Sequence, residues 1–129
     1  MQSHEITLVQ EWHQALNTGN LEKLVALVST DVQMGGPRGT VKGADEMLAW
    51  VARAHMTLTP QRYFQRKHVV GVEALGQWYD PETNLVKGQQ LVVTVFTIED
   101  QRITQIARYD NRREAFEVFG LQDEDEVHQ

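Results

Sequence analysis

The last predicted strand, residues 102–109, carries an arginine near its end and is followed closely by an aspartate. Side chains alternate between the two faces of a strand, so Ile106, Arg108 and Asp110 share one face. The Arg108 guanidinium can bind a carboxylate or another anionic group of a ligand through two parallel hydrogen bonds. It can also form an internal ion pair with Asp110 or another acid, or face solvent at a cavity mouth. We favour these last two interpretations slightly.

Asp110 is a candidate acid or base, a role that would require burial to raise its pKa. It also directly precedes the helix predicted over residues 111–119. An aspartate at that point can accept hydrogen bonds from the free amides of the first turn, and capping is the favoured interpretation.

His13 follows Trp12 on the first predicted helix, and its imidazole is a further candidate acid or base because it titrates near neutrality. Adjacent residues on a helix point in different directions, so a position on the helix flank is favoured for His13. The histidines and carboxylates show no helical ligand spacing, and the chain has no cysteine. We therefore expect no metal ion and no cofactor.

The order of periodic segments predicts helices first and a sheet afterwards. Apolar residues recur at helical spacing in the first part of the chain, and from Leu58 the period changes to two. Ser3 is suited to begin the first helix and Gly19 to end it, and Gly120 is suited to end the last helix. This order predicts an α+β cone, in which a curved antiparallel sheet packs on three N-terminal helices and a short C-terminal helix follows. The predicted helices are 3–16, 21–28, 43–54 and 111–119, and the predicted strands are 59–65, 69–79, 90–98 and 102–109, with a short extended segment at 32–34.

Several large side chains are candidate walls of a pocket inside this cone. Core packing is the favoured interpretation of each one alone, but together they indicate a flat, apolar ligand. Thr94 joins them because it belongs to the strand face that we assign to the inside. Gly35 and Gly36 either admit a ligand close to the backbone or shape the bend before Pro37. The candidate walls are Trp12, Met34, Trp50, Trp78 and Phe96.

A chain of 129 residues fits one domain, predicted over residues 1–121, with an acidic tail over 122–129. Its formal net charge is −6, and no basic patch suits a phosphate backbone, so we expect no nucleic-acid partner. We see no signal peptide and no membrane-spanning run, and we therefore expect a cytoplasmic protein without a membrane partner.

The strand predicted over residues 90–98 is apolar on both faces. Leu91, Val93 and Val95 alternate with the set assigned to the inside, which is Val92, Thr94 and Phe96. The first set therefore needs cover, and this predicts a homodimer formed through the sheet.

Four stretches of the sequence carry a resemblance that covers nearly the whole domain: "ALNTGNLEKLVALVSTDVQM", "GGPRGTVKGADEMLAWV", "VVGVEALGQWYDPETN" and "VVTVFTIEDQRITQIARYDNRREAFEVFGL". They resemble the nuclear transport factor 2-like superfamily, and within it the SnoaL-like, ketosteroid isomerase-like proteins. The resemblance implies the cystatin-like cone, with the Arg108 face toward the cavity. It does not select an activity, because this scaffold hosts isomerases, dehydratases, hydrolases, cyclases and binding modules.

The catalytic residues of known relatives do not carry over to this sequence. A steroid isomerase of this fold uses a tyrosine, a general-base aspartate and a neutral aspartic acid, where this chain has Trp12, Gly36 and Thr94. A limonene epoxide hydrolase uses an aspartate–arginine–aspartate set, and the matching positions are Ala74, Gly76 and Arg108. Polyketide cyclases keep an acid near the Arg108 position, where this chain has the arginine itself, and its nearest acid is Asp110, two residues further on.

Three functions remain open from the sequence. The first is a pocket protein for an apolar ligand with an anionic or carbonyl group, held by Arg108 among Trp12, Trp50 and Phe96. The second is a cofactor-free isomerase, dehydratase or cyclase with Asp110 or His13 as base and Arg108 stabilising an enolate-like charge. The third is a dimeric interaction module whose cavity is filled by side chains.

Overall fold

The computed structural model describes residues 2–36 and 39–127. No helix in this part of the chain is both long and apolar enough to cross a membrane. The elements in chain order are α1 (His4–Thr18), α2 (Leu21–Leu27), β1 (Val28–Gly36), β2 (Gly39–Lys42), α3 (Ala44–Ala54), β3 (Met56–Arg66), β4 (Val69–Tyr79), β5 (Val86–Glu99), β6 (Arg102–Tyr109), α4 (Arg112–Phe119), a 3-10 turn η1 (Asp123–Asp125) and β7 (Glu126–Val127).

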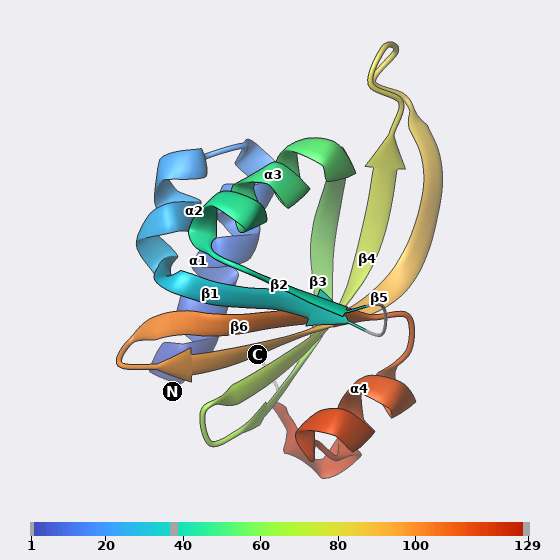
Figure 1. Cartoon of the computed structure of the whole chain (residues 1–129). Helices are drawn as coiled ribbons and strands as arrows, with labels where there is room; N and C mark the ends of the chain where they lie inside the picture. The colour runs from blue at the N-terminus through green and yellow to red at the C-terminus, as the bar shows by residue number, and fades with distance from the viewer. Residues whose placement is uncertain (1, 37–38, 128–129) are drawn as a thin grey trace.

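The strands form one curved sheet in the order β2-β1-β6-β5-β4-β3-β7, which confirms the predicted α+β cone (Figure 1). β3 to β6 make the expected antiparallel meander, but β1 pairs with β6 in parallel. The sequence predicted only residues 32–34 of β1 as extended, because the polar run Ser29-Thr30-Asp31 resembles the end of a helix. This run lies where the β1–β6 register shifts.

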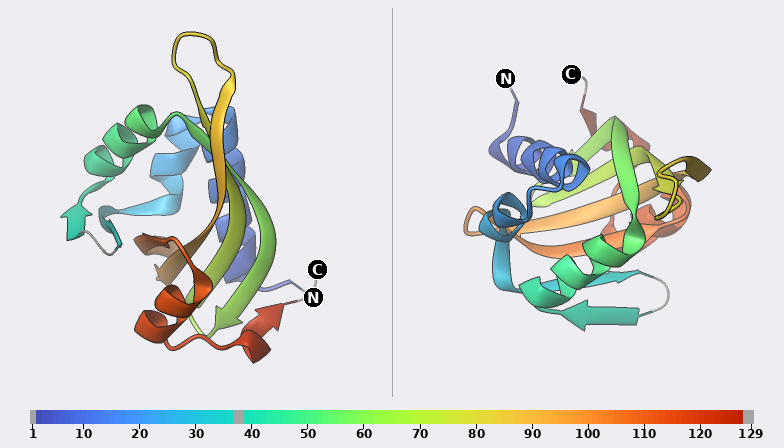
Figure 2. Two further views of the ribbon diagram at one scale, coloured as in Figure 1. Left: turned by 90° about the vertical axis from the view of Figure 1, so that its right-hand side faces the viewer. Right: turned by 90° about the horizontal axis from the view of Figure 1, so that it is seen from above.

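Helices cover both faces of the sheet (Figures 1 and 2). The larger core lies between α1–α3 and the inner face, and the smaller one lies between α4 and the outer face. Capping residues define the helix ends as the sequence predicted. Ser3 accepts a hydrogen bond from the Ile6 amide, while Gly19 and Gly120 end α1 and α4 with φ values of 69° and 71°.

The outer face of β5 is largely covered by the chain itself. Val93 and Val95 are buried and pack in the same cluster as Phe116 of α4. Leu91, in contrast, is 51% exposed. The apolar surface from which the sequence predicted a homodimer is thus mostly satisfied within one chain, and the dimer stays a prediction.

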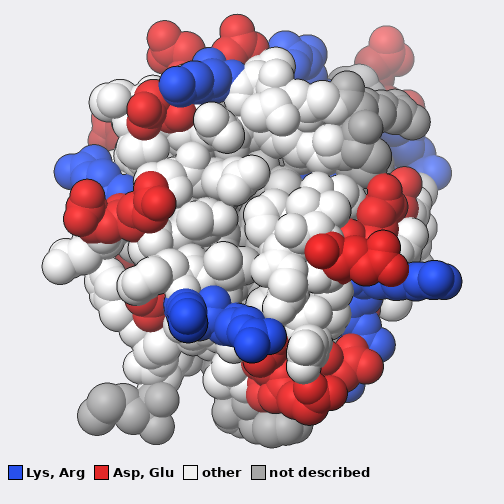
Figure 3. Space-filling model, turned by 60° about the horizontal axis from the view of Figure 1, so that its bottom comes forward, with Lys and Arg blue, Asp and Glu red and all other residues white. Residues whose placement is uncertain are grey.

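The acidic segment that the sequence predicted as a tail over residues 122–129 contains η1 and β7 as far as Val127. β7 pairs antiparallel with β3, and Arg62 of β3 donates two hydrogen bonds to the Glu126 carboxylate, at 3.0 and 3.1 Å. On the face shown in Figure 3, acidic and basic side chains lie in mixed groups around the edge, and the centre carries no charge.

Candidate ligand pocket

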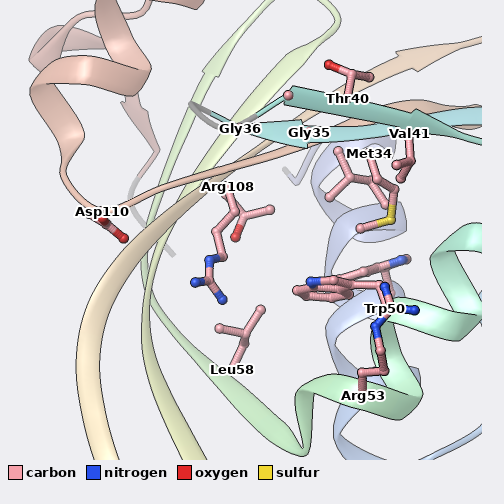
Figure 4. A pocket seen from close by; sticks show the side chains of 14 residues that line it. Met34, Gly35, Gly36, Thr40, Val41, Trp50, Arg53, Leu58, Arg108 and Asp110 are labelled. Atoms are coloured by element: carbon pink, nitrogen blue, oxygen red, sulfur yellow. The ribbon is translucent and has the colours of Figure 1, made fainter.

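A pocket of about 620 Å³ lies between the inner face of the sheet, α1 and α3. Its size is in the usual range for small-molecule sites. Apolar and aromatic side chains share its wall with glycines, two threonines, two arginines and one aspartate (Figure 4). The described residues that line it are Trp12, Met34, Gly35, Gly36, Gly39, Thr40, Val41, Trp50, Arg53, Leu58, Thr94, Ile106, Arg108 and Asp110.

Arg108 extends from β6 into this pocket (Figure 4). The β5–β6 register sets Thr94 directly opposite Arg108, so both side chains share one face of the sheet, the inner face that the resemblance implied. The guanidinium lies 3.6 Å from the Met56 sulfur and 5.7 Å from the ring centroid of Trp78. No carboxylate of the described residues forms an ion pair with Arg108. Of the two interpretations favoured from the sequence, the internal ion pair is therefore wrong, and a guanidinium at the cavity mouth stays a prediction.

Asp110 lines the pocket and is exposed. It does not cap α4, because the side chain of the next residue, Asn111, accepts the hydrogen bond from the Glu114 amide at 2.9 Å. The predicted capping role of Asp110 is thus wrong by one residue. Figure 4 shows Asp110 near the end of β6, on the opposite side of Arg108 from Trp50. Its carboxylate is available to a ligand or to solvent.

Trp12 and Thr94 bring buried polar atoms to the pocket wall. Trp12 is fully buried and Thr94 is 2% exposed. Among the residues that the structure describes, neither the Trp12 indole nitrogen nor the Thr94 hydroxyl has a hydrogen-bond partner. Buried polar groups in proteins are nearly always paired, so these two atoms require an explanation.

The remaining predicted wall residues separate into two groups. Met34 and Trp50 line the pocket with Trp12 and Thr94. The Trp78 ring centroid lies 5.7 Å from the Arg108 guanidinium, whereas Phe96 packs edge-on against Trp12 at 5.1 Å between ring centroids. Trp78 and Phe96 therefore contact lining residues without being among the residues that line the pocket.

His13 does not line the pocket, although Trp12 beside it does. It is buried in the core and not on the helix flank, and its Nδ1–H donates to the Val9 carbonyl at 2.9 Å. Burial lowers the pKa of His13 to about 4, so the imidazole is neutral at physiological pH. Its position makes His13 a core residue adjacent to the pocket wall.

Sequence reasoning missed Arg53, Leu58 and Asn17. Arg53, on α3, adds a second guanidinium to the pocket lining, opposite Arg108 in Figure 4. Asn17, near the end of α1, accepts from the Leu58 amide at 2.9 Å and donates to the Leu58 carbonyl at 2.7 Å. This pair of hydrogen bonds fixes Leu58 in the wall. A polar residue next to a helix end was the only signal for it in the sequence.

Gly36 is required by the sheet itself. A Cβ at this position would lie 2.5 Å from the carbonyl oxygen of Arg108, so only glycine allows β1 to approach β6 this closely. Close approach of the two strands is thus a third reason for a glycine here, in addition to ligand access and the bend before Pro37. The bend at Pro37 lies outside the described residues.

The described residues contain no group of three or more His, Asp or Glu side chains that could hold a metal ion. Among its described lining residues the pocket has hydrogen-bonding and electrostatic groups, namely two guanidiniums, one carboxylate, two indoles and two hydroxyls.

A family model for the SnoaL-like domain matches residues 9–106. Curated proteins provide no match. Solved structures share the fold at low identity. An NTF2-like protein of unknown function from Burkholderia pseudomallei is 19% identical, with a TM-score of 0.74 over 90% of this chain and 97% of that one. TerC, co-crystallized with polyporic acid, is 19% identical, with a TM-score of 0.72 over 90% and 97%. A Catenulispora acidiphila protein with a ketosteroid isomerase-like fold, in complex with trimethylamine, is 18% identical, with a TM-score of 0.69 over 89% and 93%.

Proposed function

For this chain, which belongs to the SnoaL-like domain family, we propose a small-molecule-binding function in which Arg108 holds an anionic group of an apolar ligand. One observation carries the proposal: Arg108, a half-buried residue, lines a pocket, and no described carboxylate pairs with its guanidinium. A charge removed from water without a partner is unfavourable, and an anionic ligand would supply the partner.

The surroundings of Arg108 suit such a ligand. Met56 and Trp78 hold the guanidinium on one side without neutralising it, because a thioether and an indole face carry no formal charge. Met34, Trp50 and Leu58 offer apolar surface to the ligand body. Arg53 adds positive charge at the exposed end of the pocket.

The comparisons support small organic ligands for this scaffold in general. TerC was co-crystallized with polyporic acid, and the Catenulispora acidiphila protein was solved with trimethylamine. The open volume of about 620 Å³ argues against the alternative of an interaction module with a filled cavity.

A cofactor-independent isomerase or lyase is the second candidate, and Asp110 is the observation that favours it. This carboxylate lines the pocket together with Arg108 and does not cap α4, because Asn111 does. In such a reaction Asp110 would move a proton and Arg108 would stabilise the enolate-like charge that develops. His13 takes no part, since it is absent from the pocket wall.

Matched acids and amides test the binding proposal. Naphthoate and naphthamide have nearly the same shape, but only the first carries a charge at neutral pH. We expect calorimetric titration to give at least about tenfold tighter binding for the acid, because a charge-assisted hydrogen bond contributes about 1.5–3 kcal/mol. Equal affinities would contradict the proposal. Turnover of a bound ketone that is lost in Asp110→Asn would favour the enzyme instead.

A further inference from the structure

We propose that the ligand carries a second anionic group, which Arg53 of α3 binds on the side of the pocket opposite Arg108 of β6. This inference rests on the proposed function and specifies its ligand class as an apolar dianion, such as a dicarboxylate. Both arginines line the same pocket of about 620 Å³, one from the helix side and the other from the sheet side (Figure 4).

The sequence of α3 brings Arg53 to the pocket wall. Arg53 follows Trp50 by three residues, and side chains at this spacing are neighbours on the surface of a helix. Trp50 also lines the pocket, so one side of α3 contributes both an indole and a guanidinium to the wall. Figure 4 shows these two residues on α3, with Arg108 on the other side of the pocket.

Arg53, like Arg108, forms no ion pair with any acid of the described residues. One turn earlier on α3 the chain has Ala49 and Trp50, and the two acids of this helix, Asp45 and Glu46, lie in its first turn. A cation in the last turn of a helix is stabilised by the helix dipole on any side of that helix. The dipole therefore does not account for the position of Arg53 on the pocket side.

The pocket and the whole chain have net charges of opposite sign. The described lining residues include two arginines and one aspartate, so they carry a formal charge of +1, whereas the chain carries −6. Asp110 lies on the opposite side of Arg108 from Trp50 in Figure 4, and it is therefore not between the two guanidiniums. A monoanion at Arg108 leaves Arg53 unpaired, whereas a ligand with an acid group at each end pairs both arginines.

Rigid aromatic diacids test this inference. Benzene, naphthalene and biphenyl dicarboxylates, with acid groups at opposite ends, cover a range of separations, and each is compared with its half-amide and its diamide. In calorimetric titrations at low ionic strength, we expect at least one diacid to bind about fivefold tighter than its half-amide, because an additional exposed ion pair forms at Arg53. At about 1 M salt the preference should fall to about twofold, the statistical advantage of two equivalent acid groups, because the Debye length is then only about 3 Å.

The amides separate this inference from the proposed function. If no diacid binds more than about twofold tighter than its half-amide, while the half-amides bind tighter than the diamides, the second anion site is wrong and the proposed function stands. Equal affinities for half-amide and diamide would contradict the proposed function, and this inference with it.

Variants locate the effect. Arg53→Gln should reduce the diacid preference to about twofold with nearly unchanged affinity for the half-amide, and Arg53→Lys should retain part of the preference because it keeps the charge. Arg113→Gln is the matched control, because it removes the same charge from an exposed position on α4, outside the pocket lining, and should retain the full preference. An undiminished preference in Arg53→Gln, or an equal loss in Arg113→Gln, would overturn the inference.

Melting temperatures of the ligand-free proteins distinguish ligand binding from a structural role at the end of α3. We expect Arg53→Gln to melt close to the wild type, because the side chain it replaces is exposed and has no ion pair with a described acid. A clearly lower melting temperature combined with an intact diacid preference would make Arg53 a structural residue and contradict the proposal.

Discussion

Arginines on the two faces of the sheet have different neighbours. On the outer face Arg112 lies 3.8 Å from both Glu73 and Asp123, and Arg62 contacts Glu126 at 3.0 Å. Both guanidiniums also lie over the Phe64 ring. On the inner face Arg108 has a sulfur and an indole as neighbours, and no described acid pairs with it. The fold supplies counter-charges where arginine has a structural role and leaves the pocket arginine without one.

Neutral polar groups show the same contrast. Trp12, His13 and Thr94 all belong to the inner side, and each has a buried polar atom without a hydrogen-bond partner among residues 2–36 and 39–127. The cluster under α4 consists of apolar and aromatic side chains such as Phe64 and Phe116, which pack edge-on at 4.9 Å between ring centroids. Within the described chain, the inner face thus carries polar atoms that no described residue pairs.

Glycine substitutions should show the largest difference between the faces. In Gly36→Ala the new methyl meets the backbone carbonyl of Arg108 at 2.5 Å, and the backbone cannot move without separating β1 from β6. We expect a loss of about 3 kcal/mol in the free energy of unfolding. In Gly71→Ala on the outer face, the methyl meets a Leu121 side-chain carbon at 2.9 Å, which can move, so about 1 kcal/mol is expected. Urea denaturation measures both, and equal losses would contradict this account of Gly36.

Acid should lower the free energy of unfolding through His13, which is buried on the inner side of the sheet. The folded-state pKa of about 4 is below the ordinary value of 6.5, so the unfolded chain gains a proton at a higher pH than the folded protein. The stability associated with neutral His13 is therefore complete above pH 6.5 and decreases as pH falls toward 4. Between pH 7 and pH 5 we expect the wild type to lose about 2 kcal/mol more than His13→Leu. Parallel pH dependence of the two proteins in urea denaturation would refute a buried, neutral imidazole.

Substitutions at the adjacent residues Asp110 and Asn111 should have different effects, one on ligand binding and the other on stability. Asn111→Ala removes the cap of α4 and should cost about 1 kcal/mol of stability without changing ligand affinity. Asp110→Asn should leave the melting temperature nearly unchanged and slightly strengthen binding of a carboxylate, since it removes a negative charge from the pocket wall. Thermal melts and titrations with naphthoate measure both effects. A large loss of stability in Asp110→Asn would reverse this assignment.

Periodicity and turn chemistry predicted much of the fold. The predicted bounds of β4 and β6, the caps at Ser3, Gly19 and Gly120, and the shared face of Ile106 and Arg108 all agree with the structure. These features depend on local sequence, namely alternation within a strand and the backbone preferences of single residues.

Features that depend on distant contacts were not predictable in the same way. β7 has only two residues and exists because it pairs with Tyr63 and Phe64 of β3. The packing of α4 on the outer face, and the approach of Gly36 to Arg108, depend on where segments far apart in the chain meet. The lack of a described partner for Trp12 and Thr94 belongs to this class too, because it depends on the whole surrounding structure.

A comparison of Arg108→Leu with Arg112→Leu tests the central claim most directly, with naphthoate affinity and melting temperature measured on both proteins. We expect Arg108→Leu to weaken binding at least about tenfold while its stability stays within about 1 kcal/mol of the wild type, because an unpaired charge is removed. Arg112→Leu should lose about 1 kcal/mol of stability, through its ion pairs and the Phe64 contact, and bind naphthoate normally. If Arg108→Leu bound naphthoate as tightly as the wild type but melted much earlier, Arg108 would be a structural residue and the proposed anion site would be wrong.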